Sequence, residues 1–345
     1  MAINNRSVPK HILVVRLSAM GDVAMLPHAV RALKSAYPDV KVTIATRKLF
    51  KPFFEGLDVN FLPVEKHEYD GWKNIRDLSR KIRALGIDAF ADTHGVWRTM
   101  FVRMWLWLHG LRTARIRKGR VEKWFRVGYS NSNAVPLKHT VIRYCDVFRR
   151  LGFDFADPEP AKKSIRPNPM GTKEGIWIGF APFSAHRGKT YPEGLREEAV
   201  KLLAAKYDRI FIHSGGGKEA EFAHAMESTY PNVTAVNGKV NGLGEEMDLI
   251  SNLDCVISMD SLVMHLSSLV ATPVVSVWGA THPEMGFLGY GCDARGVLQE
   301  EIPCRPCSTY GNTKCKYGDY RCIYAITPQL IADKVEEMLS RERKH

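Results

Sequence analysis

Short apolar runs of strand type alternate with amphipathic helical patterns along most of the chain, and this alternation constrains the fold more than any other feature. In the first half we expect strands over residues 11–17, 40–45, 59–63 and 89–92, and helices over 23–36, 48–55 and 71–85. In the second half we expect strands over 175–181, 209–213, 234–236, 255–258 and 274–278, and helices over 192–207, 218–230, 244–251 and 261–269. Strands that alternate with helices predict an α/β fold, with parallel sheets covered by helices on both faces.

The two runs of this pattern are separated by residues 152–173, which contain four prolines and are typical of a linker. A chain of 345 residues is long enough for about two domains. We therefore expect one domain over residues 1–165 and a second over 166–345, with a terminal helix over 327–343 that packs on the second domain or back on the first. Because ligands lie beyond the carboxyl ends of parallel strands, the expected site is a cleft between the two sheets.

Positive charge is concentrated in the first half. Residues 1–165 hold 30 Lys and Arg against 15 Asp and Glu, whereas residues 166–345 hold 19 against 22. Nine basic residues and one acidic residue lie within residues 98–126. An anionic partner is therefore expected to contact the first domain. No apolar run reaches the roughly 20 residues of a membrane helix, and no signal peptide pattern is present, so a cytoplasmic protein is expected.

The first expected strand is followed directly by Ser18-Ala-Met-Gly-Asp22, which opens a helix. A carboxylate there lies near the positive end of the helix and at a strand end, where a general base would be useful. Asp22 is either such a base or only a cap of the helix. No Gly-x-Gly-x-x-Gly occurs at this point, which argues against a dinucleotide site in the first domain.

Two loops of the second domain carry groups suited to an anionic ligand. Residues 181–192 contain His186, Arg187 and Lys189. An ammonium at a strand end suits a diphosphate leaving group, although a solvated basic loop is the plain alternative. Gly215-Gly-Gly-Lys-Glu-Ala220 matches a relaxed dinucleotide-binding pattern, but the acidic residue expected about 20 positions later is missing, which disfavours a dehydrogenase.

The strongest local signal is Met259-Asp-Ser-Leu-Val-Met-His265. Asp260 and Ser261 stand where a strand ends and a helix begins, so they are placed to hold ribose or phosphate oxygens. His265 follows Ser261 by four residues and shares its helix face. The alternative is a capped helix with a hydrogen-bonded histidine.

Two further features leave several interpretations open. The pattern C-x2-C-x7-C-x6-C is compatible with structural zinc or with free thiols, and is formed by Cys304, Cys307, Cys315 and Cys322. Tryptophans are interleaved with the basic residues of 98–126. Nucleic acid, an anionic membrane and a phosphorylated acceptor would all suit such a segment.

Three motifs together resemble glycosyltransferase family 9, typified by the ADP-heptose:lipopolysaccharide heptosyltransferases. They are Arg16-Leu-Ser-Ala-Met-Gly-Asp-Val-Ala-Met-Leu-Pro27, Lys189-Thr-Tyr-Pro192, and Asp260-Ser-Leu-Val-Met-His265-Leu followed by Pro273-Val-Val-Ser-Val-Trp-Gly279-Ala-Thr281. The Cys-rich loop is also familiar from several members. The resemblance implies a GT-B fold, in which two Rossmann-like domains with parallel sheets face a central cleft, the first binding the acceptor and the second the nucleotide sugar.

The same resemblance implies an inverting, metal-independent enzyme that moves heptose from ADP-heptose to the inner core of lipopolysaccharide in Gram-negative bacteria. No cofactor beyond the nucleotide sugar is implied, and the lack of an Asp-x-Asp motif agrees with metal-free donor binding. The implied acceptor is a phosphorylated lipid A/Kdo-type glycolipid, reached at the inner face of the cytoplasmic membrane. Nucleic acid is not among the implied partners.

Carried over by position, the resemblance makes Asp22 the general base and Lys189 the group that holds the leaving diphosphate. The other implied donor-binding residues are Ser184, Glu219, Asp260, Ser261 and His265. The residues expected to bind the acceptor are Ser18, Arg98, Arg115, Arg117, Lys118 and Arg120. Leu262 stands where the family usually has Gly, and a side chain there would alter the approach to the donor phosphate. The alternatives are a member that uses another nucleotide sugar and a basic nucleic-acid- or membrane-binding protein without catalysis.

Overall fold

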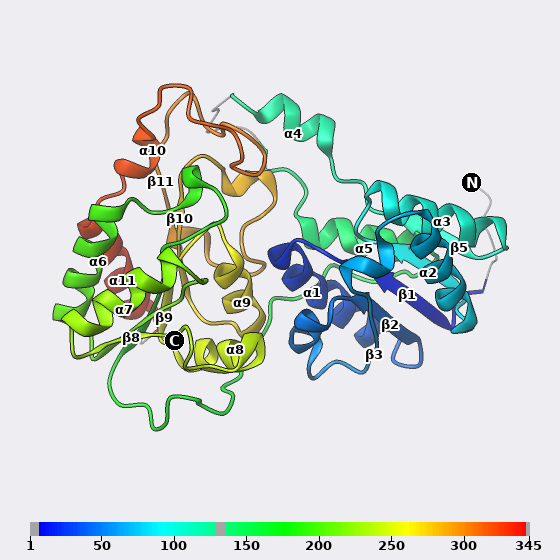
Figure 1. The fold of residues 1–345 in the computed structure, drawn as a ribbon, viewed down its shortest axis with the longest axis horizontal. Helices are drawn as coiled ribbons and strands as arrows, with labels where there is room; N and C mark the ends of the chain where they lie inside the picture. The colour runs from blue at the N-terminus through cyan, green and yellow to red at the C-terminus, as the bar shows by residue number, and fades with distance from the viewer. Residues whose placement is uncertain (1–6, 129–134, 343–345) are drawn as a thin grey trace. The chain divides into compact units, whose positions relative to one another are not determined.

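The computed structural model describes residues 7–128 and 135–342, and the chain divides into two compact units (Figure 1). The first unit comprises Met1–Lys118 and Thr140–Glu159, and the second comprises Gly119–His139 and Pro160–His345. The units therefore differ in two places from the domains expected from the sequence. The second unit begins at residue 160 rather than 166, and it also takes in residues 119–139.

The first unit is built on a five-stranded parallel sheet in the order β3-β2-β1-β4-β5. Its strands are β1 (His11–Val15), β2 (Lys41–Thr46), β3 (Asn60–Pro63), β4 (Ala89–Asp92) and β5 (Arg112–Arg115). Its α-helices are α1 (Met20–Ala36), α2 (Trp72–Ala84), α3 (Trp97–Leu108) and α5 (Thr140–Arg150). Two segments are 3₁₀-helices, η1 (Lys48–Phe54) and η2 (Lys66–Tyr69). We expected an ordinary helix over 48–55, but Pro52 removes a backbone donor, which favours the short 3₁₀ form.

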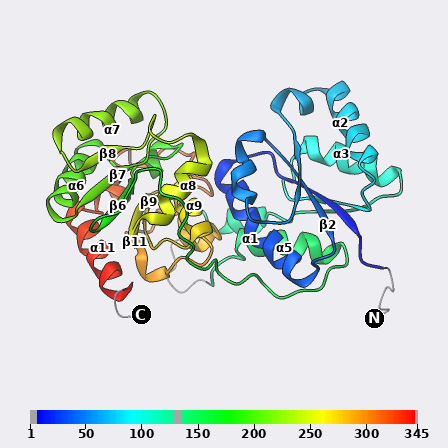
Figure 2. The same cartoon turned by 90° about the horizontal axis from the view of Figure 1, so that it is seen from below.

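The helices of the first unit cover both faces of its sheet. Figure 2 shows α1 with α5 on one side and α2 with α3 on the other. All five residues of β1 are buried, as expected for a central strand that is packed on both faces. Leu13 and Phe90 of the sheet pack with Ile82 of α2 and Leu106 of α3 in one hydrophobic core.

The second unit has a six-stranded parallel sheet in the order β11-β10-β9-β6-β7-β8. Its strands are β6 (Trp177–Ala181), β7 (Arg209–Ile212), β8 (Val233–Ala235), β9 (Cys255–Met259), β10 (Val274–Trp278) and β11 (Val297–Gln299). Its α-helices are α4 (Arg120–Arg126), α6 (Glu193–Lys206), α7 (Lys218–Thr229), α8 (Gly242–Asn252), α9 (Leu262–Val270), α10 (Arg321–Tyr324) and α11 (Pro328–Glu342). Three short 3₁₀-helices are η3 (Arg187–Lys189), η4 (Pro283–Met285) and η5 (Ala294–Gly296).

The terminal helix α11 packs against α6, β9 and β10 within the second unit (Figure 1). Its start is the one expected from the sequence, because the Thr327 hydroxyl accepts a hydrogen bond from the Leu330 amide at 3.2 Å, and Pro328 is the first helical residue. The end of the expected helix, residue 343, lies outside the described residues.

The main elements that the sequence did not predict lie between residues 97 and 150: α3, β5, α4 and α5. In α3 and α4 large apolar side chains face solvent, so the usual alternation of apolar core and polar surface is lost. Among the described residues, no helix is both long enough and apolar enough to cross a membrane.

Candidate active site

The expected general base, Asp22, lies near the carboxyl end of β1, in the first unit. Asp22 is the third residue of α1, and its carboxylate forms an ion pair with the guanidinium of Arg16, which directly follows β1. Arg16 is 5% exposed and also donates to the Thr93 carbonyl oxygen at 2.7 Å. The Tyr144 hydroxyl donates to the backbone oxygen of Asp22 at 3.0 Å. These contacts hold a partly exposed carboxylate in a fixed position at the edge where parallel sheets bind ligands.

A buried histidine and a buried carboxylate lie beside this ion pair. His94 follows β4, and its Nε2 atom is 3.3 Å from the Ser18 hydroxyl. Burial, and then the positive charges of Arg16 and Lys118, lower the pKa of His94 to about 3, so its ring is neutral at physiological pH. Asp92 accepts hydrogen bonds from the backbone amides of His94 and Gly95, while its burial raises the pKa of its carboxyl.

The six expected acceptor-binding residues do not form one group. Three of them lie around His94. The Ser18 hydroxyl contacts its ring, and the positive charges of Arg98 and Lys118 are near enough to lower its pKa. Arg98 is also held by Asp70, at 2.9 Å, and lies over the ring of Trp97.

The other three lie elsewhere. Arg115 is exposed on β5. Arg117 is exposed, and its charge lies near Arg150. Arg120 begins α4 and so belongs to the second unit. The basic segment 98–126, which the sequence assigned to one acceptor domain, is therefore divided between the two units at residue 118.

Several residues expected to bind the donor meet at the carboxyl ends of β6, β9 and β10 in the second unit. The Lys189 ammonium is 3.2 Å from a carboxylate oxygen of Asp260, and the same oxygen accepts a hydrogen bond from the Thr281 hydroxyl at 2.8 Å. The Ser184 hydroxyl donates to the backbone oxygen of Asp260 at 3.1 Å. Both charged groups are largely buried. An ammonium has three N–H donors, so Lys189 keeps capacity for phosphate oxygens beside Asp260.

Close backbone packing explains why these loops meet. The Ala280 amide donates to the Gly188 carbonyl oxygen at 2.8 Å, and a Cβ atom at Gly279 would collide with that same oxygen. Arg305 is 1% exposed, and it donates to the carbonyl oxygens of Gly279 and Thr281. A buried guanidinium thus fixes the loop after β10, which carries Thr281.

The other residues expected to bind the donor lie in two places. Ser261 precedes the first residue of α9, and its hydroxyl lies 3.2 Å from the Ser258 hydroxyl. His265 is buried one turn further along the same helix. Glu219 lies in α7, where its carboxylate accepts a hydrogen bond from the Gly215 amide at 2.9 Å. No contact joins Glu219 to the Lys189 cluster among the described residues.

All seven cysteines are free thiols, and in the described residues no three His, Cys, Asp or Glu side chains are arranged to hold a metal ion. Burial raises the pKa of the Cys307 thiol to about 11, and burial also raises the pKa of Cys322. The thiols of Cys307 and Cys322 are therefore protonated near neutral pH.

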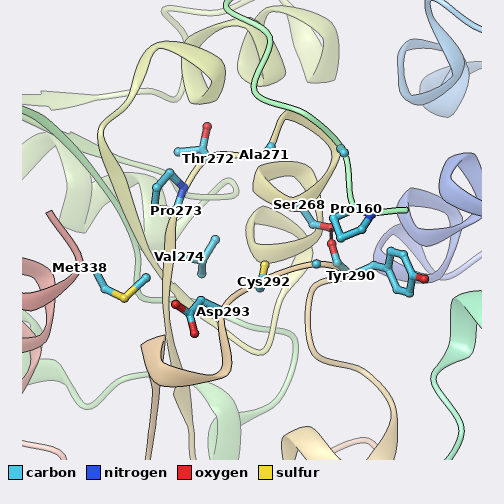
Figure 3. Close-up of a pocket in the computed structure, with 12 residues that line it drawn as sticks. Pro160, Ser268, Ala271, Thr272, Pro273, Val274, Tyr290, Cys292, Asp293 and Met338 are labelled. Carbon is cyan, nitrogen blue, oxygen red and sulfur yellow. Dashed lines mark hydrogen bonds between the residues drawn. The ribbon is translucent and has the colours of Figure 1, made fainter. Parts of the chain in front are cut away.

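The second unit also contains a pocket of about 130 Å³, which lies away from Lys189 and Asp260 (Figure 3). It is lined by Pro273 and Val274, which precede and begin β10, and by Cys292 and Ser268. It therefore lies toward the amino end of β10, whereas Thr281 follows the carboxyl end of the same strand. The pocket is therefore separate from the cluster of Lys189, Asp260 and Thr281.

Sequence reasoning did not select four residues that take part in the contacts described above: Arg16, His94, Ser258 and Thr281. Arg16, His94 and Thr281 each follow a strand, so the rule that selected Asp22 and Asp260 could also have selected them. The pairing of Thr281 with Asp260 depends on the fold, because the two residues are 21 residues apart and follow different strands.

Comparisons with known proteins identify the family of this chain. The sequence profile of glycosyltransferase family 9 (heptosyltransferase) matches residues 75–317. Lipopolysaccharide core heptosyltransferase OpsX of Haemophilus influenzae is 22% identical over 286 residues, which cover 80% of each chain.

Among solved structures, E. coli heptosyltransferase WaaC with ADP matches with a TM-score of 0.65 at 19% identity, covering 95% of this chain and 99% of WaaC. E. coli ADP-heptose lps heptosyltransferase II matches with a TM-score of 0.69 at 18% identity, covering 96% of this chain and 99% of that one. The predicted α/β class and the implied GT-B fold are confirmed. Because the family profile spans more than half of the sequence, the chain belongs to glycosyltransferase family 9 (heptosyltransferase) and is a glycosyltransferase.

Proposed function

We propose that this protein transfers heptose from ADP-heptose to the inner core of lipopolysaccharide, with inversion at the anomeric carbon and without a metal ion. The family and the names of the relatives support the heptosyltransferase class. The observation that carries the proposal is the buried cluster of Lys189, Asp260, Thr281 and Ser184 at the carboxyl ends of three parallel strands. A positive group in that position suits a nucleotide diphosphate.

In the donor site, Lys189 binds diphosphate oxygens and stabilises the negative charge that grows on ADP as it leaves. Asp260, whose carboxylate also accepts a hydrogen bond from Thr281, holds the ammonium through one of its three donors, so the remaining donors are directed to the ligand. Ser261 and the backbone amides at the start of α9 add donors for phosphate oxygens. His265 and Glu219 complete the proposed contacts to the sugar and the ribose.

At the acceptor, Asp22 acts as the general base. An acceptor hydroxyl oxygen attacks the anomeric carbon, the bond from that carbon to the diphosphate oxygen breaks, and the hydroxyl proton passes to Asp22. One displacement of this kind inverts the anomeric centre. Arg16 orients the carboxylate through their ion pair. The ring of His94 is neutral and adds no positive charge beside the base.

The proposed acceptor is a phosphorylated lipid A/Kdo-type glycolipid at the inner face of the cytoplasmic membrane. Arg98 and Lys118 lie near His94 and supply positive charge beside the proposed base. Such groups would bind acceptor carboxylates or phosphates with charge-assisted hydrogen bonds. Catalysis requires the base of the first unit and the diphosphate site of the second to act on one acceptor and one donor.

The test of the base is an Asp22→Asn variant, with Asp39→Asn as the control because Asp39 is an exposed acid of the same unit. Turnover of ADP-heptose on a lipid A/Kdo acceptor should fall by roughly 10²- to 10⁴-fold in Asp22→Asn. Calorimetry should still show ADP binding, and turnover should be unaffected by a metal chelator. Transfer at the wild-type rate by Asp22→Asn would exclude Asp22 as the base.

A family member with another donor is the second candidate, because Leu262 occupies the first position of α9 beside the proposed phosphate contacts. Thermal shifts with ADP-, UDP-, GDP- and CDP-sugars separate the two candidates. Stabilisation by ADP-heptose alone supports the proposal, whereas stabilisation by a UDP-sugar in its place would refute it. A Leu262→Gly variant shows whether that side chain limits the donors that bind.

A further inference from the structure

Helix α3 exposes a continuous apolar stripe. Its outward positions are Trp97, Met100, Met104, Trp107 and Leu108, all exposed and none of them polar. Trp107 is 61% exposed and Leu108 is 68% exposed. The opposite face of α3, including Val102 and Leu106, packs in the core of the first unit. A helix that is apolar on both faces is normally buried or lies in a membrane interface.

The stripe borders an apolar groove between α2 and α3. The groove has a volume of about 590 Å³. Trp72 and Ile75 line it from α2, and Phe101, Met104 and Leu108 line it from α3. Trp72 is exposed and lies against Phe101, with ring centroids 4.3 Å apart. Two tryptophans line this apolar hollow, and tryptophan is enriched where proteins meet the headgroup region of a bilayer.

Positive charge flanks the stripe on two sides. Helix α2 carries five basic residues and one acid, and Lys73 and Arg76 border the apolar groove itself. Beyond the C-terminal end of α3, Trp107 also lines a second pocket, of about 520 Å³, together with Arg112, Arg149 and Arg150. Apolar side chains bordered by cations complement a surface of hydrocarbon and anionic headgroups.

We propose that the exposed face of α3, with the basic face of α2, is a docking surface for an anionic phospholipid bilayer. The tryptophan, methionine and leucine side chains of the stripe enter the headgroup region, and the basic residues of α2 bind lipid phosphates. This inference rests on the proposed function only in that the acceptor is a membrane lipid. Docking would keep the enzyme on the surface where that acceptor is found.

Vesicle binding tests the proposal without any need for catalysis. The full chain is sedimented with vesicles of phosphatidylethanolamine and phosphatidylglycerol, and with vesicles of phosphatidylcholine alone. The stripe variant is Met104→Ser/Trp107→Ser/Leu108→Ser, and the charge variant is Arg76→Glu/Arg80→Glu. The controls change other exposed residues, in Leu49→Ser/Leu330→Ser and Lys201→Glu.

We expect preferential binding to the anionic vesicles. The stripe variant should lower that binding by roughly tenfold or more. The charge variant removes two positive charges and adds two negative ones, so it should lower binding by about 25-fold or more. Both control variants should bind like the wild type. Circular dichroism should show all variants folded, because the altered side chains face solvent.

Three results would overturn the proposal. The first is a wild type that does not bind anionic vesicles. The second is binding that survives the stripe variant and is lost instead on changing Val121, Trp124 and Phe125, the exposed apolar residues of α4. The third is a wild-type dimer that the stripe variant converts to a monomer, because a second copy of the chain would then cover the stripe.

Transfer assays distinguish this proposal from the proposed function. If both hold, the stripe variant keeps wild-type turnover on a deacylated, water-soluble acceptor and loses turnover on the same acceptor embedded in vesicles. A wild type that transfers heptose to neither acceptor refutes the proposed function, while its vesicle binding still decides the docking surface.

Discussion

The buried His94 predicts a measurable loss of stability in mild acid. Its side chain lies beside Ser18 and Arg16, and burial together with nearby positive charge lowers its pKa to about 3. In the unfolded chain the ring titrates at its ordinary pKa of about 6.5. Below that pH the unfolded chain takes up a proton that the folded chain does not. The stability contributed by neutral His94 is therefore complete above pH 6.5 and is lost as the pH falls toward 3.

The size of the effect follows from the two pKa values. At about pH 5 the unfolded form is almost fully protonated and the folded form is almost fully neutral. Linkage then lowers the free energy of unfolding by about 2 kcal/mol relative to pH 7.5. Burial also lowers the pKa values of His139 and His282 in the second unit to about 4, so these residues further reduce the free energy of unfolding in mild acid.

A His94→Gln variant isolates the contribution of this one ring. Urea unfolding of wild type and variant is measured at pH 7.5 and at pH 5, and the difference between their free energies of unfolding is compared. We expect wild type to lose about 2 kcal/mol more than the variant over this interval, because Gln does not titrate. A difference that stays constant between the two pH values would show that His94 takes up its proton equally in both states, and would refute the argument.

Two further predictions concern the donor site and the packing behind it. Lys189→Ala should weaken ADP binding in calorimetry by roughly 10- to 100-fold, because a charge-assisted hydrogen bond contributes about 1.5–3 kcal/mol; unchanged affinity would remove Lys189 from the site. Gly279→Ala should lower the thermal midpoint and reduce activity, because its Cβ would collide with the Gly188 carbonyl oxygen. The control Gly194→Ala places its methyl group in open space and should leave both unchanged.

Three of the candidate site residues share one feature: each follows a strand. Asp22, Lys189 and Asp260 were selected in this way, and the structure places each of them at the carboxyl edge of a sheet. Arg16 and Thr281 stand in equivalent positions but were passed over as site residues. Their importance depends on which carboxylate each one contacts, and nothing in the local sequence states that contact.

The periodicity of the sequence by itself determined the α/β class, the two runs of parallel strands and the strand ends at which Asp22 and Asp260 lie. These features are local, because each depends on the spacing of apolar residues within a few turns or one strand. The tertiary structure decided where the basic segment 98–126 lies in the fold and which of its side chains are exposed. It places α3 in the first unit and α4 in the second, and it turns the Trp-rich face of α3 to solvent.

Neither the division of this segment between the two units nor the exposed face of α3 could be predicted from the spacing of apolar residues. Helix α3 is apolar on both faces, and only packing decides which face is buried. The same holds for the ion pairs of Asp22 and Asp260. The partners of Asp260 come together because β6, β9 and β10 are neighbours in the sheet and end at one edge, whereas Arg16 and Asp22 both follow β1 and meet across the turn into α1.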